Sequence, residues 1–188
     1  MVDERVEKVA KVLVDYSTET KSGDRVLIRT DLFAKELALE VYRQALLKGA
    51  HPWIRTDLPG VRYLFHRYAT ENQLRCLPEH DFDEIKRTDV YIFLGAPFNV
   101  KDMTSIDPAR ISVRAKALKP ITDWRVEKTR LVVFYYPTEA MAQEAGMSLQ
   151  EFEDFVYTAS LVDWKQLSKQ LQMLKRRVDG VDKVEIES

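Results

Sequence analysis

The three histidines are the first residues to test for chemistry, because imidazole serves both as a metal ligand and as an acid–base group. They stand at His51, His66 and His80, and no two of them have the ligand spacing of an H-x-x-x-H motif. Cys76 is the only cysteine, so no cysteine cluster accompanies them. The sequence therefore disfavours a zinc site and favours ordinary surface or half-buried histidines.

Residues 79–84, EHDFDE, form the densest acidic run and could attract a divalent cation. The run has no glycine at its centre and no EF-hand register. Carboxylates also stabilise the positive end of a helix dipole. We expect this run to begin a solvated helix.

Other catalytic and nucleotide-binding motifs are missing from the sequence. It contains no G-x-S-x-G elbow, no G-x-G-x-x-G fingerprint and no Walker motif, and Cys76 lies in a predicted helix without an obvious histidine partner. The basic cluster at 175–177 suits a helix C-terminus. The chain carries no recognisable catalytic constellation of its own.

Composition favours a single domain, 1–188, of a soluble protein. The chain has 188 residues, 45% hydrophobic and 31% charged, with a formal net charge of −1. This balance gives no global field for nucleic acid or an anionic membrane. No apolar run reaches the roughly 18 residues of a membrane span, and the N-terminus lacks a signal-peptide core. We expect a cytoplasmic protein.

Strand-like and helical segments alternate, which favours an α/β fold with an open, mainly parallel sheet of four to five strands and helices on both faces, Rossmann-like in class. The predicted strands are 25–29, 53–56, 90–94 and 131–135, with a short fifth at 183–186. The unbroken apolar runs 90–94 and 131–135 predict neighbouring parallel strands buried on both faces.

One site-level hypothesis follows from this topology, since open parallel sheets meet ligands and partner domains at the carboxyl ends of their strands. These ends carry Arg29, Thr30, Asp31, Gly95, Pro97 and Asn99. We expect them to face a catalytic domain or its cleft. The alternative is that they belong to plain βα loops.

The stretch from Tyr136 to Trp164 has a more specific pattern. Thr138 is positioned to cap a short helix ending near Gly146, and Ser148 with Glu151 forms a capping box for a second helix. The sequence of this stretch resembles the segment Y-P-T-x-A-x-A-Q-E-A-G-M-S-x-x-E-[FY]-E-D-F of the thermophilic-type, aminopeptidase T-like metallo-aminopeptidases. Further similar motifs occur in the same order: LVDYS at 13–17, GDRVLI at 23–28, YRQALLKGAHP at 42–52, IDP at 106–108 and WRVEKTR at 124–130.

The resemblance implies an N-terminal domain of an enzyme that removes N-terminal residues from peptides. In that family two divalent metal ions, such as zinc, cobalt or magnesium, are bound by residues that lie C-terminal to this kind of segment. The resemblance therefore implies that this chain has no metal-binding or catalytic residue and is inactive alone. Its expected partners are its own catalytic C-terminal domain and, in the full-length enzyme, peptide substrates. The alternative is a stand-alone binding or oligomerisation module.

An apolar stripe near the end of the chain could face such a partner. It comprises Leu167, Leu171, Leu174, Val184 and Ile186. We expect it to be exposed and to support a weak homodimer. The alternative is that these residues close the core of this domain.

Overall fold

The computed structural model describes residues 3–185. The four strands are β1 (Arg25–Asp31), β2 (His51–Asp57), β3 (Val90–Gly95) and β4 (Arg130–Tyr135). The helices are α1 (Glu4–Lys11), α2 (Lys35–Leu47), α3 (Val61–Tyr68), α4 (Glu71–Arg75), α5 (Glu79–Lys86), α6 (Pro108–Ala117), α7 (Lys119–Lys128), α8 (Glu139–Glu144), α9 (Leu149–Ser160) and α10 (Trp164–Val178). A π-helical turn, η1 (Val12–Ser17), extends α1, and a 3₁₀ turn, η2 (Leu32–Ala34), precedes α2.

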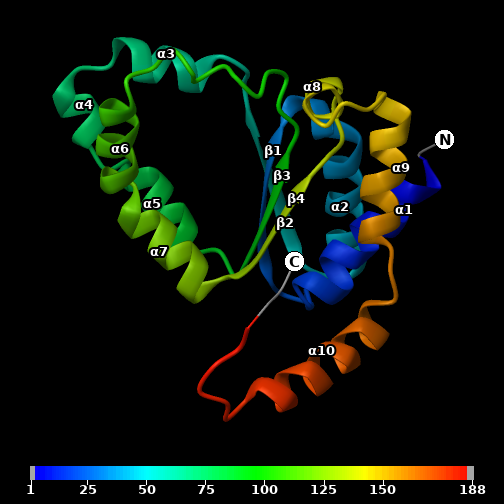
Figure 1. The fold of residues 1–188 in the computed structure, drawn as a ribbon. Coiled ribbons are helices and arrows are strands. Elements are labelled where there is room, and N and C mark those ends of the chain that lie inside the picture. Colours follow the sequence, from blue (N-terminus) through cyan, green and yellow to red (C-terminus); the bar gives the residue numbers. More distant parts are fainter. Residues whose placement is uncertain (1–2, 186–188) are drawn as a thin grey trace.

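The strands form one parallel sheet in the order β2-β1-β3-β4, with helices on both faces (Figure 1). This confirms the predicted fold class. β2 is an edge strand, which explains how it tolerates Pro52. The capping box of Ser148 and Glu151 begins α9, as the sequence predicts. The Asp107 carboxylate caps α6, which begins with Pro108, as this pair of residue types favours.

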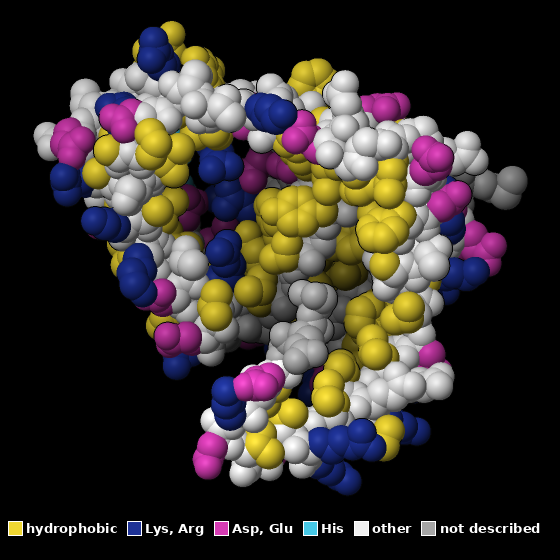
Figure 2. Space-filling model, viewed as in Figure 1, with side chains coloured by type: hydrophobic (Ala, Val, Ile, Leu, Met, Phe, Trp, Pro, Cys, Tyr) yellow, Lys and Arg dark blue, Asp and Glu magenta, His cyan; other side chains and the backbone are white. Residues whose placement is uncertain are grey.

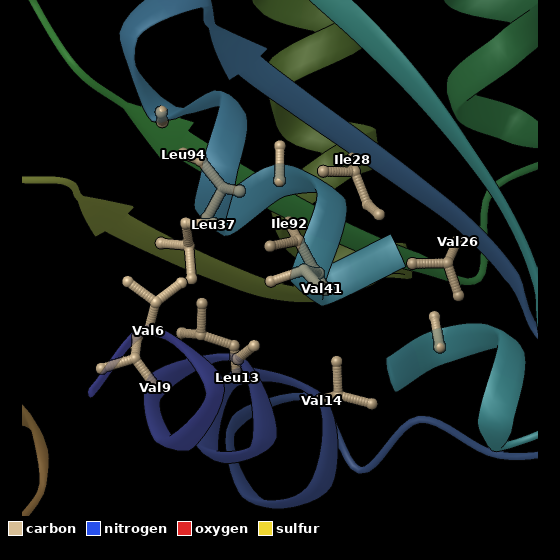
Figure 3. Packing of buried hydrophobic residues seen from close by; sticks show 14 of the residues in the cluster. Val6, Val9, Leu13, Val14, Val26, Ile28, Leu37, Val41, Ile92 and Leu94 are labelled. Carbon is tan, nitrogen blue, oxygen red and sulfur yellow. The ribbon is translucent and has the colours of Figure 1, made fainter. Parts of the chain in front are cut away.

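The main core lies between the sheet and the layer of α1, α2 and α9. Figure 3 shows Val6 and Val9 of α1 and Leu37 and Val41 of α2 converging on Ile92 from β3. All five side chains are at most 1% exposed. The buried residues of α1 and α2 recur at helical spacing, and those of the strands alternate along the chain. Each element therefore presents one apolar face to the core.

The opposite face is covered only in part. Leu27, Tyr91 and Ile85 form a smaller core there with side chains of α5 and α7. The segments α3, α4 and α6 pack on one another farther along, where Arg110 of α6 donates to the carbonyl oxygens of His66 and Ala69. In Figure 1, α3, α4 and α6 lie on the same side of the sheet as α5 and α7, farther from the strands.

The burial expected for 131–135 is wrong in part. β3 and β4 are neighbouring parallel strands, as predicted, and β3 is largely buried. β4 is the other edge of the sheet, and its Val133 and Tyr135 are 51% and 52% exposed. An apolar strand run therefore did not distinguish a central strand from an edge strand with one open face.

The predicted fifth strand is not found in the described part of the chain. Residues 183–185 have no regular structure, and Ile186 lies outside the described residues. The alternative that the terminal leucines close the core is also wrong, since Leu171 and Leu174 are each 56% exposed and Val184 is 58% exposed. Within residues 3–185, no helix is long and apolar enough to cross a membrane.

Asp89 joins the amino ends of three strands. Its carboxylate accepts hydrogen bonds from the backbone N and the Nε of Arg25, both at 2.9 Å, while its own carbonyl accepts from the Arg130 backbone N at 3.1 Å. The hydrogen bonds from Arg25, opposed by burial, lower the pKa of Asp89 from 3.8 to about 2.

We therefore expect Asp89→Asn to destabilise the chain by about 1 kcal/mol at neutral pH, since the side chain is about one-third exposed and solvent screens the pair. The folded pKa is depressed, so this stability is present above pH 3.8 and is lost as pH falls through about 2. Urea unfolding over a pH series measures the difference from the parent chain.

Asp83→Asn is the matched control, because within residues 3–185 the Asp83 side chain makes only an exposed contact with Lys86, at 3.3 Å. It should change stability by less than about 0.5 kcal/mol. A destabilisation by Asp89→Asn that stays constant as the carboxylate protonates would contradict the assignment.

Candidate functional site

Asp31 and Ala96 connect the carboxyl ends of β1 and β3, where the sequence hypothesis placed a site. The Asp31 Oδ2 accepts a hydrogen bond from the Ala96 backbone N at 2.7 Å. Ala96 is 1% exposed, so the bond satisfies a buried donor. The strand order changes direction between β1 and β3, and this contact lies at the point where open α/β sheets usually admit ligands.

The loop after β3 is also tied to the loop after β4. The Pro97 carbonyl accepts from the Thr138 hydroxyl at 3.0 Å, and the Gly95 carbonyl accepts from the Tyr136 backbone N at 2.7 Å. Thr138 also caps α8 by accepting from Met141 N. The conformation of the Tyr136–Trp164 stretch is therefore coupled to the sheet edge.

Gly95 is required by close packing. A Cβ built on Gly95 would lie 2.6 Å from the Tyr135 ring and 3.1 Å from the Phe93 ring. The two rings stand edge to face with centroids 6.3 Å apart. The missing side chain at 95 thus leaves room for an aromatic pair on the open face of the sheet.

Arg29 and Thr30 point to opposite faces of the sheet. Arg29 forms a two-pronged ion pair with Asp57, with Nε–Oδ2 and Nη2–Oδ1 distances of 2.7 and 3.1 Å. Partial burial alone would lower the pKa of Arg29, but the hydrogen bonds and charge of Asp57 outweigh it and hold the pKa above its usual value. The guanidinium therefore remains charged.

Thr30 instead lines a small cavity beside α2. The cavity has a volume of about 180 Å³ and is shared with Asp31, Lys35, Ile54 and Thr56. Pockets for complete small ligands are commonly about 300–1,000 Å³. This one has room for a single side chain rather than a peptide.

Asn99 stays apart from these groups. Its side-chain Oδ1 accepts a hydrogen bond from the Lys101 backbone N at 2.9 Å, within an exposed turn. The six predicted residues thus divide into a connected set at the β1–β3 edge, an arginine on one face, a threonine on the other and an isolated turn residue.

Sequence analysis missed a repeated tripeptide that was visible in the chain. Arg-Thr-Asp occurs at 29–31 and again at 55–57, and the two copies lie in register on β1 and β2. The Asp of the second copy, Asp57, is the partner of Arg29 in the first. Sequence analysis also missed the exposed, stacked pair Phe33 and Phe98, whose centroids lie 5.4 Å apart over the loops after β1 and β3.

The described residues do not provide a metal site. Between residues 3 and 185, no group of three or more His, Cys, Asp or Glu side chains is arranged to hold an ion. The acidic run 79–84 forms the start of α5 as expected, and its Asp81 and Glu84 contact Arg55 at 2.6 and 3.3 Å. These two carboxylates therefore form ion pairs with an arginine of the same domain.

The parallel sheet, its strand order and its two helical layers define an open α/β domain. A comparison with known families matches residues 2–188 to "Thermophilic metalloprotease (M29)", and the chain belongs to this family. The resemblance noted in the sequence is thereby confirmed.

Among solved structures, wild-type AmpT from Thermus thermophilus matches with a TM-score of 0.70 and 15% sequence identity, over 92% of this chain and 49% of that chain. The chain therefore spans about half the length of this relative, and the likeness supports the fold. An alcohol dehydrogenase superfamily protein from Novosphingobium aromaticivorans gives a TM-score of 0.35 at 12% identity, over 85% of this chain and 48% of that one, too low to support an argument. Comparison with curated proteins gave no match.

The bond between Asp31 and Ala96 makes a direct prediction. Asp31→Ala leaves a buried N–H without its acceptor, which should cost roughly 1–3 kcal/mol of unfolding free energy. Asp31→Asn retains an acceptor oxygen and should cost less. Denaturant unfolding of both variants measures the difference.

Asn99→Ala is the control from the same edge, because it removes only an exposed turn contact. It should change stability by no more than about 0.5 kcal/mol. Equal losses in Asp31→Ala and Asn99→Ala would refute the assigned role of Asp31.

Proposed function

We propose that this chain is the N-terminal, non-catalytic domain of a metal-dependent aminopeptidase, and that it shapes access of peptides to the active site. The observation that carries the proposal is the family match over residues 2–188 combined with the lack of a metal-ligand cluster between residues 3 and 185. The ligands for zinc, cobalt or magnesium would then belong to a separate catalytic half.

The carboxyl edge of the sheet is the surface proposed to face that catalytic half. Leu32, Phe33 and Phe98, here called the edge patch, are 47%, 48% and 71% exposed. Aromatic side chains of this size are common at the centres of interfaces. The bond between Asp31 and Ala96 would hold the two loops that carry the patch at a fixed spacing.

We expect the purified chain to release no N-terminal residue from peptides in the presence of zinc, cobalt or magnesium. The physical reason is that water activation and carbonyl polarisation need a ligand set that residues 3–185 do not supply. Peptide hydrolysis followed by chromatography, with a chelated sample as the control, measures this. Metal-dependent turnover clearly above the chelated control would mean that the active site lies in this chain.

A second candidate is a stand-alone binding or oligomerisation module, and α10 is the observation that favours it. Leu167, Leu171, Leu174 and Val178 recur on one side of α10, and none is buried. Figure 2 shows hydrophobic side chains along one side of α10 and Lys and Arg along the other. Reading the coding sequence past Ser188 for acidic and histidine metal motifs distinguishes the two candidates.

In either case we propose that the apolar stripe of α10 supports a weak homodimer. Sedimentation should show association that Leu171→Glu weakens at least about tenfold, because the substitution places a charge in an apolar contact. Gln170→Glu, one position earlier on the same helix, is the matched control and should leave association unchanged. A monomeric parent chain at all concentrations would exclude the dimer.

We also propose a cytoplasmic location. A single free cysteine, exposed in the structure, fits a reducing compartment.

A further inference from the structure

The sheet face opposite α1 and α2 has an open half. α5 and α7 cover its amino-terminal part through the small core around Leu27 and Tyr91. Toward the carboxyl ends, the Arg29 side chain is 46% exposed. Val133 and Tyr135 are 51% and 52% exposed. Figure 2 shows a hollow between the α6 side and the strands, with both Lys or Arg and Asp or Glu side chains inside it.

Two arginines lie on this face of the sheet. Arg125 of α7 lies over the Tyr91 ring, 5.0 Å from its centroid, and its Nη1 is 3.4 Å from the Tyr91 hydroxyl oxygen. Arg29 lies on the neighbouring strand, two residues beyond Leu27, which is the register partner of Tyr91. Guanidinium groups from α7 and from β1 therefore lie on the same face of the sheet.

The charges in this cluster do not balance. Arg29 is matched by Asp57, and the neighbouring Arg55 is matched by Asp81 and Glu84. Arg125 forms no ion pair with any carboxylate of residues 3–185, and its buried Nε finds no hydrogen-bond acceptor among them. A half-buried guanidinium without a counter-charge favours an anion from outside the domain.

α6 carries further positive charge. Arg110 and Arg114 donate to backbone carbonyl oxygens of the α3–α4 segment, and within residues 3–185 neither forms an ion pair with a carboxylate. Their charges are therefore not neutralised by the hydrogen bonds that fix them. Arginines outnumber carboxylates among the residues named here, and an excess of one charge raises the local concentration of oppositely charged ligands.

An aromatic wall borders the cluster. Arg29 lies beside Phe93 in the β1–β3 register, and Phe93 meets the exposed Tyr135 edge to face. The absence of a side chain at Gly95 lets the Tyr135 ring occupy this position. A ligand whose anionic group reaches the arginines would place its adjoining atoms against these rings.

We propose that this hollow binds a carboxylate group of a peptide, with Arg125 as its main partner and with Phe93 and Tyr135 in contact with the neighbouring side chain. Arg29, fixed by Asp57, and the Tyr91 hydroxyl set the position of the carboxylate. Taking a peptide as the ligand rests on the function proposed above. The carboxylate comes from a peptide C-terminus or from an acidic side chain, and both have the same chemistry.

The test is a titration of the purified chain with three peptides that carry a carboxylate at the C-terminus, nowhere, or on a side chain. They are the tripeptide Ala-Gly-Phe with a free C-terminus, the same peptide as its C-terminal amide, and Ala-Glu-Phe as its amide. The measurements are calorimetric affinity and the NMR signal of the Arg125 Nε–H. We expect one or both carboxylate peptides to bind and to shift that signal, while the amide of Ala-Gly-Phe does not bind.

Arg125→Gln should weaken this binding about tenfold or more, because it removes charge-assisted hydrogen bonds. Lys128→Gln, which removes the same charge near the end of the same helix, should bind like the parent. Tyr91→Phe removes only the hydroxyl and should weaken binding less. It also keeps the test decisive if Arg125→Gln fails to fold, which far-ultraviolet circular dichroism and thermal melting would reveal.

Binding of the free acid alone assigns the site to peptide C-termini, and binding of the glutamate peptide assigns it to acidic side chains. The inference is overturned by equal binding of all three peptides, by no binding of any, or by full binding to a folded Arg125→Gln. The titration needs no metal and no turnover. Carboxylate binding in a chain whose reading frame has no catalytic half would refute the proposed function and leave this inference standing.

Discussion

The pairing of β1 with β3 is the constraint on which the rest of the structure depends. Parallel strands have no tight turn between them, and here the chain forms β2 and four α-helices, α2 to α5, before it returns as β3 to pair with β1. Two aspartates fix the pair at its ends. Asp89 binds Arg25 at the amino end, and Asp31 binds Ala96 at the carboxyl end. The register between them is consequently determined by polar groups as well as by the core.

Local signals explain which elements could be predicted from the sequence. Ser148, Glu151 and Asp107 act within one helical turn, so their capping roles needed no knowledge of the tertiary structure. The start of α7 was missed, although proline suits the first turn of a new helix as well as the end of an old one.

Non-local arrangements could not be predicted in the same way. The apolar run of β4 is as strong as that of β3, but only the strand order makes β4 an edge with Val133 exposed. The carboxyl-edge hypothesis found Asp31 because topology alone places strand ends together. Arg125 and Tyr91 are far apart in the chain, and their contact depends on how α7 packs against the sheet. The repeated Arg-Thr-Asp was overlooked because its meaning depends on β1 and β2 being in register.

The attachment of α10 has a mechanical consequence. Its first residue is held by the domain, since the Trp164 ring stacks on Tyr16 at 5.9 Å and its carbonyl accepts from the Tyr16 hydroxyl at 3.2 Å. No residue of α10 is buried, and a helix of 15 residues extends about 22 Å from this point. α10 thus extends from its attachment at Tyr16, which belongs to the π-helical turn η1. If α10 rotated by about 10° about this attachment, the far end of a helix of that length would move by roughly 4 Å. A small rearrangement of η1 would therefore cause a large displacement at the end of α10.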